Sequence, residues 1–370
     1  MKSKFDLLII SHAKTNIGTF NTLFAYAKAI TINSKKKVCL ICPNSNNNLF
    51  TKHKKISKNL SIIYLPSYNY HKYFNLQLVR LVYLIGILFS YDYRCILASG
   101  FSQPQISIPV TMAKIFKSKK VLYIWDDMWG NGLGKKINST INRIFLFSEK
   151  LSFKYCDHFI LLSSFFEKKL KKMNLEFTKV YQPYFKNKPT NMSVSLAKNL
   201  KKKYSIHKHD EIIVCMGNAF FDTEEIILNT LEKLRLKKIK FKCFFMGKFK
   251  ISNHNKNKYK KLVNQNIINL GFVNDRSLFE GVMEIGNLYI LPMARNLIEK
   301  SRFPVRIYDY INRNKIIVSN ATGEMSYIFK KYKIGILTKY SPEYFYKGII
   351  KSLKMSKLKK KNIIKNQTIA

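Results

Sequence analysis

Short apolar runs alternate with longer stretches of helical periodicity along most of the chain. In the first half, the runs with the length of buried strands are 5–10, 38–42, 61–65, 95–98, 121–124 and 159–162. Segments between them, such as 20–30 and 105–116, space their apolar residues as one face of a helix does. This alternation predicts βαβ units built around a parallel sheet.

A second series of the same kind follows a basic, polar bridge at 186–203. Its strand-like runs are 212–216, 241–246, 267–270, 288–291, 316–319 and 334–337. The sequence therefore predicts an α/β protein with two Rossmann-like parallel-sheet domains, 1–185 and 186–345, facing across a cleft. The remaining residues, 346–370, predict a basic C-terminal helix that packs back on the N-terminal domain.

The chain has a large excess of positive charge, with 66 Lys plus Arg against 21 Asp plus Glu, or 66 − 21 = +45. Nucleic-acid binding, contact with an anionic membrane and compositional drift are three interpretations of this excess. The lysines are spread in short runs, and 46% of residues are hydrophobic, which excludes a disordered basic protein. No zinc-finger, RRM or KH pattern is present, so we expect no specific nucleic-acid partner.

Neither apolar run near the N-terminus predicts a targeting or membrane-spanning segment. The run at 5–10 is too short for a signal peptide, and the run at 76–89 is broken by Arg80 and is shorter than the ~20 residues that span a bilayer. Cys39 and Cys42 lie three apart on a predicted strand and so point to opposite faces. We expect free buried thiols, a cytoplasmic location, and neither metal nor cofactor.

The first candidate for a binding site is the polar loop at 11–20, which contains Gly18 between a strand and a helix. Glycine at a helix N-terminus lets backbone N–H groups approach a phosphate. A tight strand-to-helix turn explains the same residue without any ligand, and both interpretations stay open.

The second candidate is the strand at 121–124, which runs into Trp125, Asp126 and Asp127. Site residues collect at the carboxyl ends of strands in α/β sheets. Aromatic rings beside carboxylates suit a sugar, which stacks on an indole ring and donates hydrogen bonds to carboxylate oxygens. There are two alternatives: one of the two Asp residues caps the following helix, or the two together bind a metal ion.

The third candidate is the segment 291–311. Pro304 predicts a helix that begins there and runs through Tyr310. Arg306 and Asp309 share a face of this helix, and Arg302 lies in the loop that enters it. Cations near a helix N-terminus indicate a bound anion, although an ordinary Arg306–Asp309 surface pair is the alternative.

The run 302–310, followed by the strand at 315–319, resembles the "Pro, any, Lys/Arg, two apolar, acid, Tyr" element of family 4-like glycosyltransferases with the GT-B fold. Segments similar to other elements of that family follow the same order over essentially the full length. They are the glycine loop at 17–19, the strand at 155–163, the first strand and turn of the nucleotide domain at 215–218, and the base-proximal strand and turn at 269–273.

This resemblance implies that 1–185 is the acceptor-side domain and that 186–345 binds a nucleoside diphosphate sugar. Asp309 matches the acid that holds the ribose, and Arg302 and Arg306 lie where the diphosphate is held. The donor-binding residues are then Gly18, Gly217, Asn218, Phe272, Val273, Arg302, Phe303, Arg306 and Asp309, and the catalytic ones are Asp126, Asp127 and Arg306. Asn218 and Glu224 stand near positions that are basic in the family, and Ser301 stands where a Glu is common.

The implied activity is that of a hexosyltransferase which is retaining, metal-independent and engaged in cell-surface glycan or polysaccharide synthesis. Its acceptor is a glycan or a lipid-linked sugar. The basic run at 52–58 and the apolar run at 76–89 suggest peripheral contact with an anionic membrane at its inner face, unless they are solvated lysines beside a buried helix. The alternatives are a degenerate nucleotide-sugar or carbohydrate-binding protein and a basic nucleic-acid-binding protein.

Overall fold

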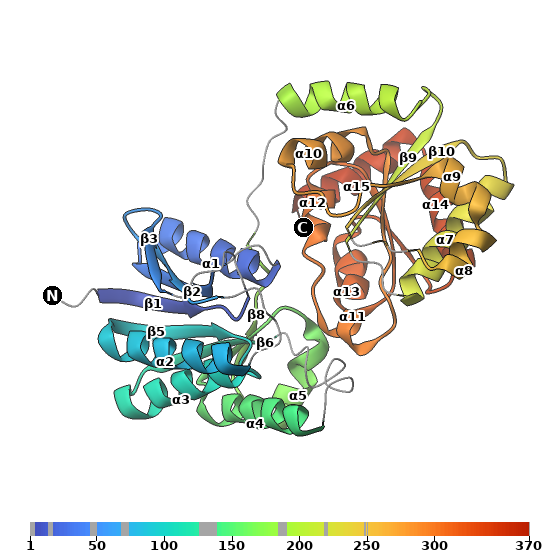
Figure 1. Ribbon diagram of the computed structural model, residues 1–370. Coiled ribbons are helices and arrows are strands. Elements are labelled where there is room, and N and C mark those ends of the chain that lie inside the picture. Colours follow the sequence, from blue (N-terminus) through green and yellow to red (C-terminus); the bar gives the residue numbers. More distant parts are fainter. Residues whose placement is uncertain are drawn as a thin grey trace. The chain divides into compact units, whose positions relative to one another are not determined.

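The structure is a computed structural model (Figure 1), which describes residues 4–13, 18–44, 50–67, 74–125, 139–183, 191–217, 221–247, 249 and 251–369. The chain divides into two compact units, Met1–Phe185 and Lys186–Ala370. Each unit has its own sheet and its own hydrophobic core.

The first unit is built on an eight-stranded sheet with the order β3-β4-β2-β1-β5-β6-β7-β8. Its strands are β1 (Lys4–Ile10), β2 (Val38–Pro43), β3 (Lys52–Lys55), β4 (Leu60–Leu65), β5 (Asp92–Ser99), β6 (Lys120–Trp125), β7 (His158–Leu161) and β8 (Phe177–Lys179). Every neighbouring pair is parallel except β3 and β4, which are antiparallel. The parallel strands are joined by helical crossovers, as the sequence predicts.

Helices cover both faces of this sheet (Figure 1). On one face α1 (Gly18–Ser34) packs on Val38, Leu40 and Cys42 of β2. On the other face α2 (Phe74–Ser90), α3 (Pro104–Lys117) and α4 (Ser139–Tyr155) pack on a cluster that includes Cys39 and Ile41. Cys39 and Cys42 therefore point to opposite faces, and both are free thiols, as predicted. A 3₁₀ turn (Ser164–Phe166) and α5 (Glu167–Lys172) connect β7 to β8.

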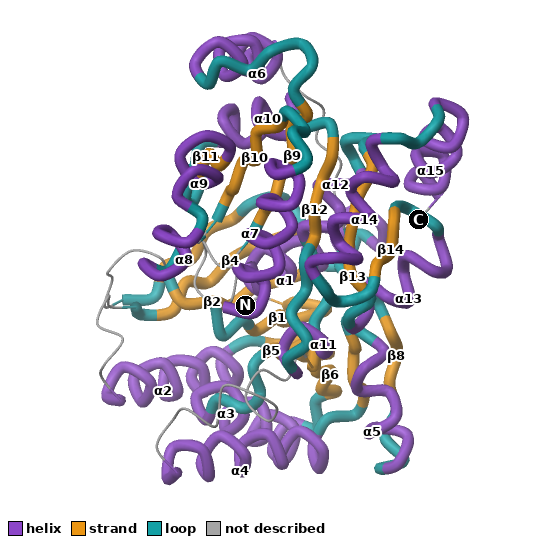
Figure 2. Tube along the Cα trace, turned by 90° about the vertical axis from the view of Figure 1, so that its right-hand side faces the viewer, coloured by secondary structure: helices purple, strands orange, loops and turns teal. Residues whose placement is uncertain are grey.

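The second unit is built on a six-stranded, fully parallel sheet with the order β11-β10-β9-β12-β13-β14, and Figure 2 shows these strands side by side. The strands are β9 (Glu211–Met216), β10 (Phe241–Met246), β11 (Ile267–Asn269), β12 (Leu288–Leu291), β13 (Ile316–Asn320) and β14 (Ile336–Thr338). The helices are α6 (Asn191–Lys203), α7 (Phe221–Leu236), α8 (Asn253–Lys258), α9 (Lys260–Asn266), α10 (Arg276–Ile285), α11 (Leu297–Ser301), α12 (Arg306–Ile311), α13 (Gly323–Tyr332), α14 (Pro342–Leu353) and α15 (Lys357–Ile369).

The C-terminal segment differs from the single helix that the sequence predicts. It forms two helices, α14 and α15, separated by a short turn. Within the second unit, α15 packs against α12, α13 and β13. The Gln367 amide anchors α15, because its Nε2 donates to the carbonyl oxygens of Lys315 and Ile334, at 2.9 and 2.7 Å.

Candidate functional site

The strand order of the second unit reverses between β9 and β12, which are hydrogen-bonded neighbours although two strands separate them in the sequence. Chain connections leave β9 toward β10 on one side and leave β12 toward β13 on the other. In open parallel sheets ligands bind at such a switch point, outside the carboxyl ends of the strands. The carboxyl ends of β9 and β12 are therefore the expected place for a ligand site.

Three glycines follow the carboxyl ends of β9, β10 and β11. Gly217, Gly247 and Gly271 all have positive φ, of 107°, 126° and 63°. The Gly217 N–H donates to the Met246 carbonyl at 2.7 Å, and the Gly247 N–H donates to the Gly271 carbonyl at 2.6 Å. A Cβ on Gly247 would overlap the Gly217 carbonyl, so only glycine fits there. In this glycine rim the N–H of Gly271 also donates within the protein, to Asn269 Oδ1 at 3.1 Å, and Gly271 is the one of the three whose Cβ position meets no atom within 4 Å.

Arg306, the first residue of α12, lies directly on this rim. A Cβ built on Gly217 would overlap the Arg306 guanidinium. The Arg306 Nη2 atom also lies 3.7 Å from the sulfur of Met293, which follows β12. The guanidinium therefore spans the carboxyl ends of β9 and β12, at the switch point.

The charge of Arg306 is not neutralised within the described residues. None of the ion pairs found among the described residues involves the Arg306 guanidinium, so the alternative of an Arg306–Asp309 surface pair finds no support there. The Nε atom of Arg306 is buried and has no hydrogen-bond acceptor among those residues. A guanidinium held in this way is suited to binding an anion.

Arg302, which the sequence groups with Arg306, already has a carboxylate partner. Its Nη2 donates to Oε1 of Glu299 in α11, and the Glu299 side chain is only 2% exposed. Burial lowers the pKa of the Arg302 guanidinium, and the positive charge of Arg306 lowers it further. Of the two arginines, Arg306 is thus the one whose charge is available for a ligand.

Tyr310 fixes the position of α12 and hence of Arg306. Its hydroxyl accepts a hydrogen bond from the Met216 N–H of β9, at 2.7 Å, and donates to the Ile290 carbonyl of β12, at 3.2 Å. Its ring stacks on Tyr289 with 4.7 Å between centroids. Burial raises the pKa of Tyr310 well above its usual value, so the hydroxyl keeps its proton. Sequence analysis missed this role, although Tyr310 lies one helical turn after Arg306.

Glu224 of α7 holds the chain that follows β10. Its carboxylate is 3% exposed, and Oε1 accepts hydrogen bonds from the Ser252 N–H at 3.0 Å and from Asn255 Nδ2 at 2.9 Å. Sequence analysis noted Glu224 only as a position that is basic in the family. Its buried anchoring of residues 252–255 is a structural role.

The other predicted donor residues have different surroundings. Asp309 is half-buried on α12, one turn from Arg306, and Phe303 is buried with its ring 5.2 Å from that of Tyr308. Phe272, which follows the glycine rim, is 69% exposed, and Val273 after it is half-buried.

Three more of the predicted residues, Asp126, Asp127 and Asn218, lie outside the described residues. Gly18 begins α1 in the first unit. The helix predicted to start at Pro304 begins at Arg306, although the Ile307 N–H donates to the Pro304 carbonyl and so forms a preceding turn.

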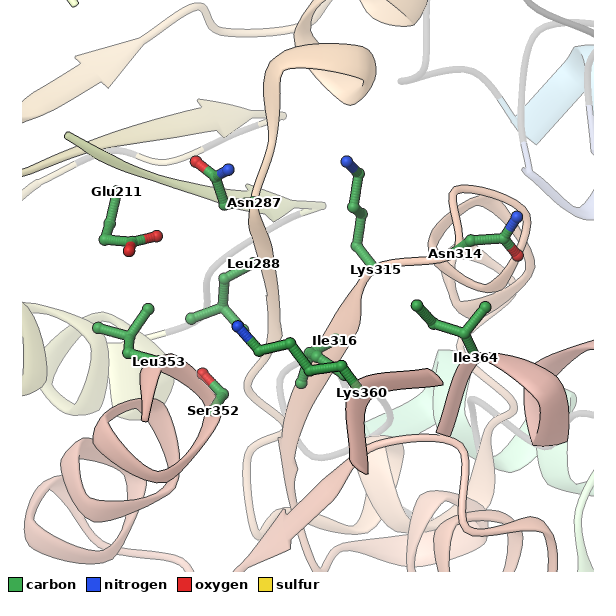
Figure 3. A pocket seen from close by; sticks show the side chains of 10 residues that line it. All are labelled: Glu211, Asn287, Leu288, Asn314, Lys315, Ile316, Ser352, Leu353, Lys360 and Ile364. Carbon is green, nitrogen blue, oxygen red and sulfur yellow. The ribbon is translucent and has the colours of Figure 1, made fainter. Parts of the chain in front are cut away.

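A cavity of about 290 Å³ lies at the opposite, amino edge of the same sheet (Figure 3). Glu211 begins β9 and Leu288 begins β12 on its wall, and Ser352 of α14 and Lys360 of α15 line it from the C-terminal helices. None of the predicted site residues that the structure describes lines this cavity. Among the residues that the structure describes, no three His, Cys, Asp or Glu side chains cluster as metal ligands would.

No family model and no curated protein sequence matches this chain. Solved structures do match it over nearly the full length of both chains. A glycosyltransferase from Rickettsia africae ESF-5 is 16% identical, with 99% of this chain and 92% of that chain covered and a TM-score of 0.69. WaaG, a glycosyltransferase involved in lipopolysaccharide biosynthesis, is 14% identical, with 98% and 95% covered and a TM-score of 0.68.

A third match is HepE from Anabaena, solved in complex with UDP-glucose. It is 12% identical, with 99% of this chain and 94% of that chain covered and a TM-score of 0.68. At this level of identity the likeness establishes the fold, and the chain has the GT-B fold, as predicted.

Proposed function

We propose that this GT-B chain transfers a sugar from a nucleoside diphosphate sugar to an acceptor hydroxyl. The observation that carries the proposal is the Arg306 guanidinium, which lies on Gly217 at the switch point without a carboxylate partner among the described residues. A diphosphate supplies the negative charge that would pair with this guanidinium.

In this proposal Arg306 acts on the leaving group. Negative charge builds on the diphosphate as the glycosidic bond breaks, and a fixed guanidinium stabilises that charge by several kcal/mol. Tyr310 keeps the guanidinium in place through its bonds to both flanking strands. Asp309 accepts hydrogen bonds from the ribose diol, and Asp126 or Asp127 orients the acceptor or a donor hydroxyl.

The finer features of the proposal rest on the resemblance. We propose that the enzyme is a retaining, metal-independent hexosyltransferase whose donor site also includes Phe272 and Val273. The complex of HepE with UDP-glucose supports a uridine diphosphate donor, and the role of WaaG in lipopolysaccharide biosynthesis supports synthesis of a cell-surface glycan.

We also propose that the first unit contacts an anionic membrane from the cytoplasmic side through the outer face of α2, α3 and α4. Figure 1 shows these three helices together on one side of the sheet. Their exposed large apolar residues are Leu78, Val79, Val82, Ile108, Ile115, Phe116, Ile144, Leu146 and Phe147. The charged residues of α3 and α4 are Lys114, Lys117, Arg143, Lys150, Lys154 and the buried Glu149. Apolar side chains among cations suit an anionic lipid surface.

This surface differs from the one that the sequence suggests. Lys52, Lys54 and Lys55 of the basic run lie in the exposed edge strand β3, while α3 and α4 supply the cations next to the apolar side chains. No described helix has the length and apolar character needed to cross a bilayer.

Pelleting with anionic vesicles at low and high salt tests the membrane contact, using a Phe116→Ser, Phe147→Ser double variant. Ile32→Ser on α1 is the control, since Ile32 is exposed on the other face of the sheet. Equal pelleting of all three proteins would remove the membrane contact from the proposal.

The donor is tested by a thermal-shift screen over UDP-, GDP-, ADP- and CMP-sugars. A cognate donor at a hundred times its dissociation constant stabilises the native state by about 2.7 kcal/mol. No shift with any nucleotide sugar would sink the proposal.

A second candidate function is nucleotide-sugar binding without transfer. Glu224 favours this function, because it stands near a position that is basic in the family. Its carboxylate accepts hydrogen bonds from Ser252 and Asn255 instead of a cation contacting the diphosphate there. Such a protein would show the same thermal shift but neither transfer nor hydrolysis of the donor. Measuring nucleoside diphosphate release with the stabilising donor separates the two functions.

A further inference from the structure

The carboxyl edge of the first unit's sheet contains a small, positively charged pocket that the proposed function does not yet use. Its walls follow β1, β2 and β4 and include Arg80 of α2 and Gln105 in the first turn of α3. The remaining space is about 10 Å³, which is room for one atom the size of a water oxygen. One phosphate or carboxylate oxygen has this size.

Arg80 is the main cation of this pocket. Its Nε–H donates to the Pro66 carbonyl at 2.9 Å, and Nη2 donates to the Ser67 hydroxyl at 3.3 Å. Burial lowers the pKa of its guanidinium. Both partners are neutral, and no carboxylate among the described residues pairs with Arg80. A guanidinium has five N–H donors, and hydrogen bonds to described residues account for two of those of Arg80.

The rest of the described pocket wall includes His12 and the N-terminus of α3. His12 lines it, with Nδ1 3.3 Å from the Ser99 hydroxyl and its ring packed on Gly100, which has a φ of 70°. Gln105 is buried and belongs to the N-terminus of α3, a 14-residue helix whose N-cap, Gln103, makes no capping bond from its side chain. The positive end of this helix is therefore not offset by a capping side chain. None of the described residues that line the pocket is an Asp or a Glu.

We propose that this pocket binds an anionic group, a phosphate or a carboxylate, of the acceptor molecule. That the anion belongs to an acceptor molecule rests on the proposed function, whereas anion binding by the pocket does not depend on it. Arg80 supplies charge-assisted hydrogen bonds to the anion, and the α3 N-terminus and His12 surround it. The enzyme thus selects acceptors that carry a negative charge near the hydroxyl group that is glycosylated.

A purely structural role for Arg80, as a brace between α2 and the end of β4, is the alternative. Arg80→Gln separates the two, because glutamine can still donate to the Pro66 carbonyl but carries no charge. Arg94→Gln is the matched control, since Arg94 lies in the same unit with a 70% exposed side chain. Arg306→Gln reports on the donor site of the second unit.

Hydrogen exchange measured with and without inorganic phosphate, and with acetate as the carboxylate probe, tests anion binding directly. We expect either anion to slow exchange of α2 and α3 amides severalfold in the wild type, Arg94→Gln and Arg306→Gln, and to have no effect in Arg80→Gln. The anion that slows hydrogen exchange more identifies the ligand class, phosphate or carboxylate. Unchanged exchange in the wild type, or equal protection in Arg80→Gln, would overturn the proposal.

Transfer kinetics then test whether the anion belongs to the acceptor. With a phosphorylated or carboxylated acceptor and its neutral analogue, Arg80→Gln should lower the preference for the charged acceptor by about ten- to a hundredfold and leave the donor KM unchanged. An unchanged preference would contradict the acceptor assignment. Loss of transfer with all acceptors, but retained phosphate protection, would count against the proposed function and not against the pocket.

Discussion

The guanidinium of Arg306 occupies the space that a side chain on residue 217 would need. Gly217 directly follows β9 and Arg306 begins α12, so this contact joins two segments that are distant in the sequence. It places the available positive charge at the switch point of the second sheet, where a nucleotide diphosphate would bind.

Gly217→Ala should abolish donor binding. The added Cβ displaces the Arg306 guanidinium, and the φ of 107° at this position strains any residue other than glycine. Gly86→Ala is the control, because a Cβ at this position in α2 meets no atom within 4 Å and should stabilise the fold by about 0.5 to 1 kcal/mol. Donor titration by calorimetry measures the first effect and urea unfolding the second. Wild-type donor affinity in Gly217→Ala would show that the contact is unimportant.

Tyr310→Phe should lower the free energy of unfolding by about 1 to 3 kcal/mol, because it leaves the Met216 N–H without its acceptor. It should also weaken donor binding, since α12 loses its bonds to both flanking strands. Tyr204→Phe is the control. The Tyr204 ring packs edge-on to Phe244, but its hydroxyl has no hydrogen bond within the described residues. Urea denaturation of both variants checks this, and equal stabilities would contradict it.

Glu224→Lys would restore the charge that the family has near this position, yet we expect it to weaken the protein. The buried carboxylate is the acceptor for the Ser252 N–H and the Asn255 amide, and a lysine cannot accept either bond. The free energy of unfolding should fall by about 2 kcal/mol or more, whereas Glu224→Gln should lose less than about 1 kcal/mol. A gain in donor affinity without loss of stability would mean that the site tolerates a cation there.

The thiols of β2 should make stability fall at alkaline pH. Burial raises the pKa of Cys39 and of Cys42 from 9.0 to about 12. Since these pKa values are higher in the folded state, their contribution is complete below pH 9 and is lost as the pH rises toward 12. At pH 10 the loss is about 1 kcal/mol per thiol. Urea unfolding at pH 7.5 and 10 should therefore show a smaller decrease in the Cys39→Ala, Cys42→Ala double variant than in the wild type. Equal decreases would place the thiols in contact with solvent.

Most of the fold follows from hydrophobic runs that can be recognised in the sequence. Each of the twelve predicted strands is found within a few residues of its predicted bounds. The strands that were missed lack this pattern. β3 consists of Lys52–Lys55, four exposed polar residues that pair with β4 at the sheet edge, and β8 is only three residues long. Edge strands bury little apolar surface, so periodicity does not reveal them.

The candidate site was predicted less completely. Sequence spacing identified Arg306, but it gave Arg302 the same role, because it could not show that Glu299 is buried beside Arg302. Their separation of three residues was a signal that was overlooked. The contact of Arg306 with Gly217, and the bridge from Tyr310 to β9 and β12, depend on how distant segments pack. No local pattern contains that information.

The most direct test of the account compares donor binding and turnover in Arg306→Gln with those in Arg235→Gln. Arg235 lies at the C-terminal end of α7, paired with Glu232, and serves as the control for loss of a positive charge in the same unit. The account predicts that Arg306→Gln folds normally but loses about a hundredfold or more in kcat/KM for the cognate nucleotide sugar, whereas Arg235→Gln keeps wild-type values. Unchanged turnover in Arg306→Gln would contradict the central claim.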